Sequence, residues 1–167
     1  MKNPRESRKC IFFIKRVLYL FGLYGFITTK KEMIAFESYA GDLISKFDTA
    51  ISSKKLFLDP EFSIKKAAKE VGTNRTYLSR SINFKTGQNF NDFINNYRSE
   101  YARGVIRNFY LKEDGKKYVY KPISMAEVAV ASGFRNLRAL NRHHVKKYGV
   151  LPSEYKNDIL TNKFRNQ

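Results

Sequence analysis

The sequence predicts an all-α protein in which two helix-turn-helix subdomains are joined by a long linker helix and preceded by a helical N-terminal extension. From residue 32 onward, apolar residues recur at the three- and four-residue spacing of helices. Two pairs of short predicted helices are each joined by a tight turn that contains glycine. The two pairs also match each other as an internal repeat. A chain of 167 residues has room for one compact domain, or for two very small domains that share a core.

Residues 1–31 form a basic and apolar N-terminal segment. Lys and Arg residues lie on both sides of an uninterrupted apolar run of about 13 residues, at 17–29. A membrane-spanning helix needs about 20 apolar residues, and no convincing cleavage site for a secretory signal is present. Three interpretations therefore stay open: a vestigial membrane anchor within 11–29, an interfacial segment, and a helix that packs on a partner.

A lead-in helix is predicted at residues 32–60. Apolar side chains alternate there with polar ones at helical spacing, and Pro60 directly after Asp59 ends the pattern.

The first helix-turn-helix unit is predicted at 63–86. Ser63 is a good N-cap, and the apolar residues that follow it fall at i, i+3, i+4 and i+7 on one helical face: Ile64, Ala67, Ala68 and Val71. Gly72 and Thr73 end this helix, and Asn74 begins the next. The second helix is predicted to face inward with Tyr77, Leu78 and Ile82 and outward with Arg75, Thr76, Ser79, Arg80 and Asn83.

A longer linker helix is predicted at 89–108, because apolar and mostly aromatic residues trace one of its faces over about four turns. We expect these aromatic residues to be core rather than platforms on which bases stack. Residues 108–122 lose the periodicity and contain an Asp-Gly pair, which predicts an exposed loop.

The second helix-turn-helix unit is predicted at 124–148. Ser124 and Glu127 have the spacing of a capping box, Gly133 lies in the turn, and Asn136 begins another arginine-rich helix.

An internal repeat relates the two units. A shift of 61 residues pairs Ser63 with Ser124 and Gly72 with Gly133. With one extra residue in the turn, a shift of 62 pairs four further positions: Asn74 with Asn136, Leu78 with Leu140, Arg80 with Arg142, and Gly87 with Gly149. Cap, turn glycine, core leucine, outward arginine and terminal glycine thus recur in order.

Charge and residue types narrow the functions that the chain can have. The 32 Lys and Arg against 15 Asp and Glu give a formal net charge of +17, which favours nucleic acid as a partner and an anionic membrane surface second. The single cysteine, Cys10, forms no disulfide within the chain, and the adjacent His143 and His144 lack the spacing of a metal site. Because no catalytic or phosphate-binding motif is present, we expect neither enzymatic activity nor a cofactor.

Two recognition helices on one chain predict the way in which it reads DNA. A recognition helix fits the major groove, and successive grooves on one side of B-DNA lie about 34 Å apart. We therefore expect a sequence-specific transcription regulator that reads two successive major-groove segments of double-stranded DNA.

The region from Leu56 to about Lys156 resembles the DNA-binding domain of the AraC/XylS family of bacterial transcription regulators. The resemblance covers about three-fifths of the chain, and its ordered combination of motifs is specific. The residues that carry it are Ser63-Ile64-x-x-Ala67-Ala68, Asn74-Arg75-Thr76-Tyr77-Leu78-Ser79-Arg80, Phe90-Asn91-Asp92-Phe93-Ile94, Arg98 with Tyr101-Ala102, Glu127-Val128-Ala129-x-x-Ser132-Gly133-Phe134 and Gly149-Val150-Leu151-Pro152-Ser153-Glu154-Tyr155. It implies an AraC-type domain over 61–160, with RNA polymerase as a candidate protein partner.

The resemblance also implies which residues contact DNA. The base-reading positions fall at Arg75, Thr76, Ser79 and Arg80 in the first unit and at Asn136, Leu137, Arg138, Asn141 and Arg142 in the second. Lys85, Lys146 and Lys147 are expected on phosphates. The second unit departs from the family pattern at Ala139, Leu140 and His144, where aromatic residues are usual. His144 corresponds to Ile82 of the first unit, and we expect it to be semi-buried.

A different class of function stays open beside DNA reading. Residues 11–29 would insert into a membrane surface, and the DNA-binding half would be diverged or inactive. We expect a cytoplasmic protein, with membrane association through 11–29 as the alternative.

Overall fold

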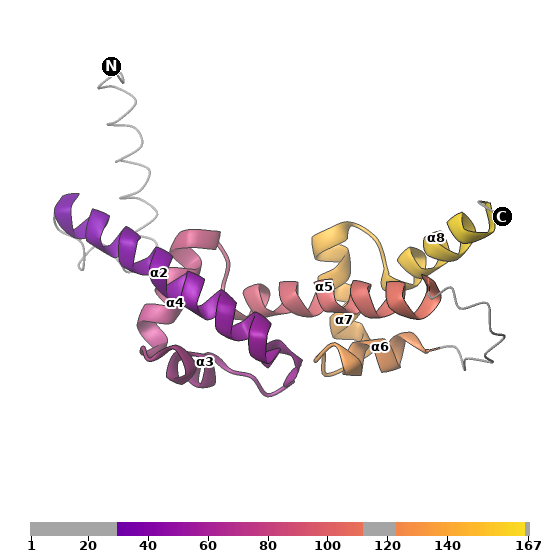
Figure 1. The fold of residues 1–167 in the computed structure, drawn as a ribbon, viewed down its shortest axis with the longest axis horizontal. Coiled ribbons are helices and arrows are strands. Elements are labelled where there is room, and N and C mark those ends of the chain that lie inside the picture. The colour runs from indigo at the N-terminus through magenta and orange to yellow at the C-terminus, as the bar shows by residue number, and fades with distance from the viewer. Residues whose placement is uncertain (1–29, 112–122, 166–167) are drawn as a thin grey trace, which may run out of the picture. The chain divides into compact units, whose positions relative to one another are not determined.

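The structure is a computed structural model that describes residues 30–111 and 123–165 (Figure 1). Over these residues every regular element is helical, which confirms the predicted all-α class. In chain order the elements are α2 (Lys30–Lys54), η1 (Leu56–Leu58), α3 (Ile64–Val71), α4 (Arg75–Thr86), α5 (Phe90–Leu111), α6 (Met125–Ala131), α7 (Leu137–Tyr148) and α8 (Pro152–Arg165). The segment 11–29 and most of the loop predicted at 108–122 lie outside the described residues.

The chain divides into two compact units, 1–42 and 43–167. The described part of the first unit is the beginning of α2. The second unit holds the rest of α2 and all the other elements, and it contains two hydrophobic cores. These cores define two subdomains: the first is built around α3 and α4, and the second around α6, α7 and α8.

The lead-in helix is shorter than the predicted 32–60. It ends at Lys54, because Lys55 adopts a left-handed conformation with φ 48° and the chain continues into the single turn η1. The end of α2 is nevertheless part of the first subdomain: Phe47 and Ile51 are fully buried in its core.

Local capping positions α3 and α4 as the sequence predicts. The Ser63 hydroxyl accepts a hydrogen bond from the Lys66 amide at 3.4 Å, and the Asn74 side chain accepts one from the Tyr77 amide at 2.9 Å. Gly72 ends α3 with φ 71°, a conformation that costs glycine nothing.

The inward face of α4 differs from the prediction at one residue. Leu78 and Ile82 are fully buried, but Tyr77 is 38% exposed. The third buried residue of α4 is Ser81, which lies three residues after Leu78 on the same face, whereas Tyr77 is rotated away by about 100°.

The second subdomain repeats this construction. Ser124 and Glu127 form the predicted capping box, with hydrogen bonds of 3.1 and 2.7 Å, and Val128 and Ala129 are fully buried. Leu140 of α7 takes the place that Leu78 has in the first subdomain, and it is also fully buried.

Helix α5 belongs to both cores and joins the two subdomains (Figure 1). Its N-terminal half contributes Phe93 and Ile94 to the first core, and its C-terminal half contributes Ala102 and Ile106 to the second. The helix continues to Leu111, beyond the predicted end at residue 108. The aromatic residues of α5 that contribute to the first core are packed in it as predicted.

Candidate nucleic-acid interface

Helix α4 presents a polar outer face that begins directly after its N-cap. Arg75 and Thr76 are exposed, whereas Ser79 and Arg80, one turn later, are partly exposed. The burial of Leu78 and Ile82 on the opposite face holds this polar face outward. Lys85 in the last turn is exposed, with its ammonium 5.9 Å from the centre of the Phe84 ring.

Helix α7 presents the equivalent face in the second subdomain. Arg138 and Arg142 are exposed, and Asn141 is partly exposed. Among the described residues, neither of these arginines forms an ion pair. Asn136 is the N-cap of α7: its side-chain oxygen accepts the Ala139 amide at 2.9 Å, as Asn74 does for α4. Its oxygen is therefore occupied within the protein, and only its side-chain amide group remains available for another contact.

The structure brings only some of the predicted base-reading residues to one concave surface. Those that line it are Ser79, Asn136, Arg138 and Arg142, whereas Arg75, Thr76, Arg80, Leu137 and Asn141 do not. This surface has a volume of about 1130 Å³ and is lined by Ser79 of α4 and by Arg138 and Arg142 of α7, among others. Further lining residues come from the N-terminal part of α5, including Asn91 and Asn95. Residues 63 positions apart in the chain, Ser79 and Arg142, thus lie around the same hollow.

Two of the predicted phosphate-binding lysines are engaged within the protein. Lys147 donates to the Asn96 carbonyl oxygen at 3.1 Å and pairs with Glu100 at 3.0 Å, and its side chain is only 28% exposed. Lys146 pairs with Asp92 at 2.9 Å, but its side chain is 63% exposed. Both lysines therefore fasten α7 to α5, and Lys146 retains more freedom to reach a phosphate.

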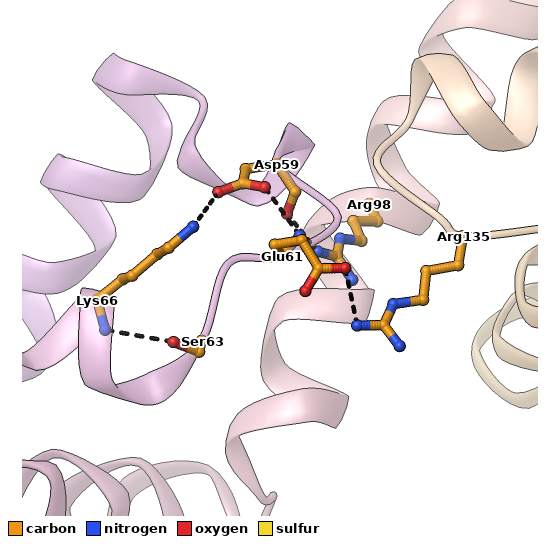
Figure 2. Close-up of polar contacts among 6 residues, drawn as sticks. All are labelled: Asp59, Glu61, Ser63, Lys66, Arg98 and Arg135. Atoms are coloured by element: carbon orange, nitrogen blue, oxygen red, sulfur yellow. Dashed lines mark hydrogen bonds and ion pairs between the residues drawn. The ribbon is translucent and has the colours of Figure 1, made fainter.

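Arg98 and Arg135 lie beside the same concave surface, although sequence reasoning gave neither of them a role. The half-buried guanidinium of Arg98 donates to the carbonyl oxygens of Phe57 at 2.7 Å and of Asp59 at 2.9 Å. Arg135 pairs with Glu61 at 2.9 Å (Figure 2). The resemblance had singled out Arg98, but its acceptors lie about 40 residues away in the chain, beyond the reach of any local pattern.

The two histidines lie in different surroundings. His143 Nε2 is 3.0 Å from Asn95 Nδ2, and its ring stacks against Phe134. His144 is fully buried rather than semi-buried, because its Nδ1 reaches the Val150 carbonyl oxygen at 2.6 Å and its ring packs against Tyr148. Burial lowers the pKa of both rings below the ordinary value of histidine.

Metal binding and membrane spanning have no support in the described part of the chain. Residues 30–111 and 123–165 contain no group of His, Cys, Asp and Glu side chains that could hold a metal ion. None of the helices placed by the structure is long and apolar enough to cross a membrane. The association predicted for 11–29 falls outside these residues and stays a prediction.

Comparisons with known proteins agree with this architecture. The sequence profile of a family described as a helix-turn-helix domain matches residues 67–158, which is more than half of the chain. No curated protein matches the chain.

Solved structures share the fold at low sequence identity. The DNA-binding transcriptional dual regulator from Escherichia coli K-12 is 17% identical, with a TM-score of 0.54 over 71% of this chain and 93% of its own. The DNA-binding domain of the global transcriptional factor AdpA, solved in complex with a target DNA, is 20% identical, with a TM-score of 0.53 over 72% and 94%. A transcriptional regulator with an AraC-type DNA-binding domain from Chromobacterium violaceum is 19% identical, with a TM-score of 0.51 over 66% and 89%.

Proposed function

We propose that this chain, which belongs to the AraC-type helix-turn-helix family of DNA-binding transcription regulators, reads two successive major-groove segments with α4 and α7. One feature supports this function most directly. The two helices are equivalent in their N-caps and in the buried leucine that each contributes to its core, and Ser79 of α4 lines the same concave surface as Arg138 and Arg142 of α7. A recognition helix uses its N-terminal residues to contact base edges, and both polar faces begin at the N-terminus of their helix.

Four residues of α4 are the proposed base readers of the first groove: Arg75, Thr76, Ser79 and Arg80. In the second groove, Arg138, Asn141 and Arg142 read bases, and Asn136 contributes only its amide group because its oxygen caps α7. An arginine can bond to O6 and N7 of guanine together, which is worth about 1–3 kcal/mol of discrimination.

Phosphate contacts set the register of the protein without reading sequence. Lys85 and Lys146 are the better proposed candidates, because their side chains are exposed. Lys147 is proposed mainly as an anchor of α7, since its ammonium already binds two groups of α5.

Selection of bound sequences from a random duplex pool tests the proposal and yields the preferred site. The full chain is expected to enrich one asymmetric sequence about two helical turns long. Arg142→Ala should then weaken binding to that site by about 5- to 150-fold, the equivalent of 1–3 kcal/mol, with a smaller loss on random DNA.

Arg107→Ala is the matched control. Arg107 is exposed on α5 and does not line the concave surface. Its substitution by alanine removes one positive charge, as Arg142→Ala does. This variant should affect the selected site and random DNA alike. Equal losses on both DNAs for Arg142→Ala would discard its base-reading role, and failure to enrich any sequence would discard the function.

The location of the protein and its protein partners are inferred from the proposed DNA-binding function. We propose a cytoplasmic place of action, where the DNA is. Contact with RNA polymerase stays a prediction.

A further inference from the structure

We infer that Arg98 and Gly133 hold the two subdomains in one relative placement and so set the number of base pairs that the chain accepts between its two half-sites, a role that rests on the proposed function. These residues, together with Phe57 and Leu58 of η1, are called here the inter-subdomain contact. Without it, the two recognition helices would be joined mainly through the single helix α5.

The turn of the second subdomain packs directly on η1 of the first. A Cβ atom at Gly133 would lie 2.5 Å from the Phe57 carbonyl oxygen and 2.8 Å from the Leu58 Cα. Both neighbours are backbone atoms, so no side-chain rotation can make room. Only glycine therefore permits this approach of the two subdomains.

Two other turn glycines, Gly72 and Gly149, distinguish the effect of this packing from the effect of backbone strain. Gly72 and Gly149 have φ 71° and 76°, close to the 79° of Gly133. A Cβ at Gly149 would meet nothing within 4 Å, and at Gly72 only the Lys46 Nζ at 4.0 Å. Alanine would bring similar strain at all three positions, but it would push on the other subdomain only at Gly133.

Arg98 connects the Phe57 carbonyl group, which also faces Gly133, to α7 through a row of hydrogen bonds. Besides Phe57 and Asp59, its guanidinium donates to Asn95 Oδ1 at 3.1 Å. The bond to Asp59 is among those drawn in Figure 2. Because arginine can only donate, the oxygen of Asn95 faces Arg98 and the amide group faces His143. The row therefore runs from η1 through α5 to α7, and it requires His143 Nε2 to be unprotonated.

Nearby surface contacts add little to this placement. The Glu61–Arg135 pair also joins the two subdomains, but its side chains are 69% and 68% exposed, and such pairs contribute little to stability. The backbone packing at Gly133 and the half-buried bonds of Arg98 are the stronger restraints.

A fixed placement has a direct consequence for DNA. One base pair inserted between the half-sites moves the second groove by about 3.4 Å and rotates it by about 34°. Two recognition helices held in one placement cannot both bind after this change. The chain therefore loses the affinity gained from simultaneous binding, about 10²-fold or more. When the inter-subdomain contact is weakened, the two recognition helices can move to match the new spacing, and the insertion costs less affinity.

Electron-paramagnetic-resonance distance measurement tests the placement without DNA. Spin labels are attached in the full chain at Lys69→Cys on α3 and Val130→Cys on α6, both exposed, with Cys10→Ser removing the native thiol. Gly133→Ala and Arg98→Met should each broaden or displace the distance distribution, whereas Gly149→Ala should leave it unchanged. An unchanged distribution in both test variants would overturn the inference, with circular dichroism confirming that each variant is folded.

Binding to spaced duplexes tests the consequence for recognition. With the selected site, the unsubstituted chain should lose about 10²-fold in affinity when one base pair is inserted between the half-sites. Gly133→Ala should lose much less on insertion, while its affinity for a duplex with one intact half-site stays unchanged. The same insertion penalty in both proteins would refute the role in spacing. If no specific site exists at all, the proposed function fails, and the distance measurement still decides on the inter-subdomain contact.

Discussion

Lowering the pH from 7 to 5.5 is expected to destabilise the folded chain through His144. This ring is fully buried, and its Nδ1 lies 2.6 Å from the Val150 carbonyl oxygen. A carbonyl group only accepts, so Nδ1 carries the proton of the neutral ring and Nε2 is the bare nitrogen. Among the described residues Nε2 has no hydrogen-bond partner, so protonation would bury an unpaired N–H and a charge. Burial therefore lowers the pKa of His144.

The direction of the effect follows from the two protonation states. In the unfolded chain histidine titrates near its ordinary value of about 6.5. Below that pH the unfolded chain binds a proton that the folded chain does not, and the free energy of unfolding falls by up to about 1.4 kcal/mol per pH unit until the folded pKa is reached. Above it neither state holds the proton, so this contribution is constant. His143, whose pKa burial also lowers, adds a dependence of the same sign.

Urea unfolding, followed by circular dichroism between pH 5.5 and 8, measures this dependence. His144→Ile places in the second subdomain the residue that Ile82 supplies in the first, and it should reduce the slope below pH 6.5 whatever it does to stability at pH 8. His143→Asn combined with His144→Ile removes both histidines of the chain and should abolish the slope in this range. If His144→Ile unfolds with the same pH dependence as the unsubstituted chain, the assignment of the buried neutral ring is wrong.

Three further predictions test the subdomains and their surfaces. Leu140→Ala should lower the free energy of unfolding by about 2–5 kcal/mol in denaturant titration, because Leu140 is fully buried; a loss below 1 kcal/mol would contradict its place in the core. Asn74→Ala and Asn136→Ala should each cost about 0.5–2 kcal/mol as lost N-caps, and equal effects of Asn136→Ala on specific and random DNA would leave it no base-reading role. Lys146→Ala should reduce the slope of log Kd against log salt by about 1, whereas Lys147→Ala should mainly lower stability; the reverse pattern would exchange their roles.

The all-α class, the two capped helix pairs and the family could be predicted from the sequence because their signals are local. A serine or asparagine N-cap bonds to an amide three residues away, so Ser124 and Asn74 can be recognised from their immediate neighbours. The end of the lead-in helix was harder to predict: the left-handed Lys55, which no glycine marks, ends α2 before the predicted proline stop.

Only the tertiary structure decided how the local units meet, since these contacts join residues far apart in the chain. The backbone approach at Gly133 and the Phe57 acceptor of Arg98, 41 positions away, depend on how two subdomains pack. The same holds for Lys147, which the resemblance assigned to a DNA phosphate and which the fold pairs with Glu100. Capping depends on a few adjacent residues, whereas close packing depends on the position of every element, and no short stretch of sequence contains that information.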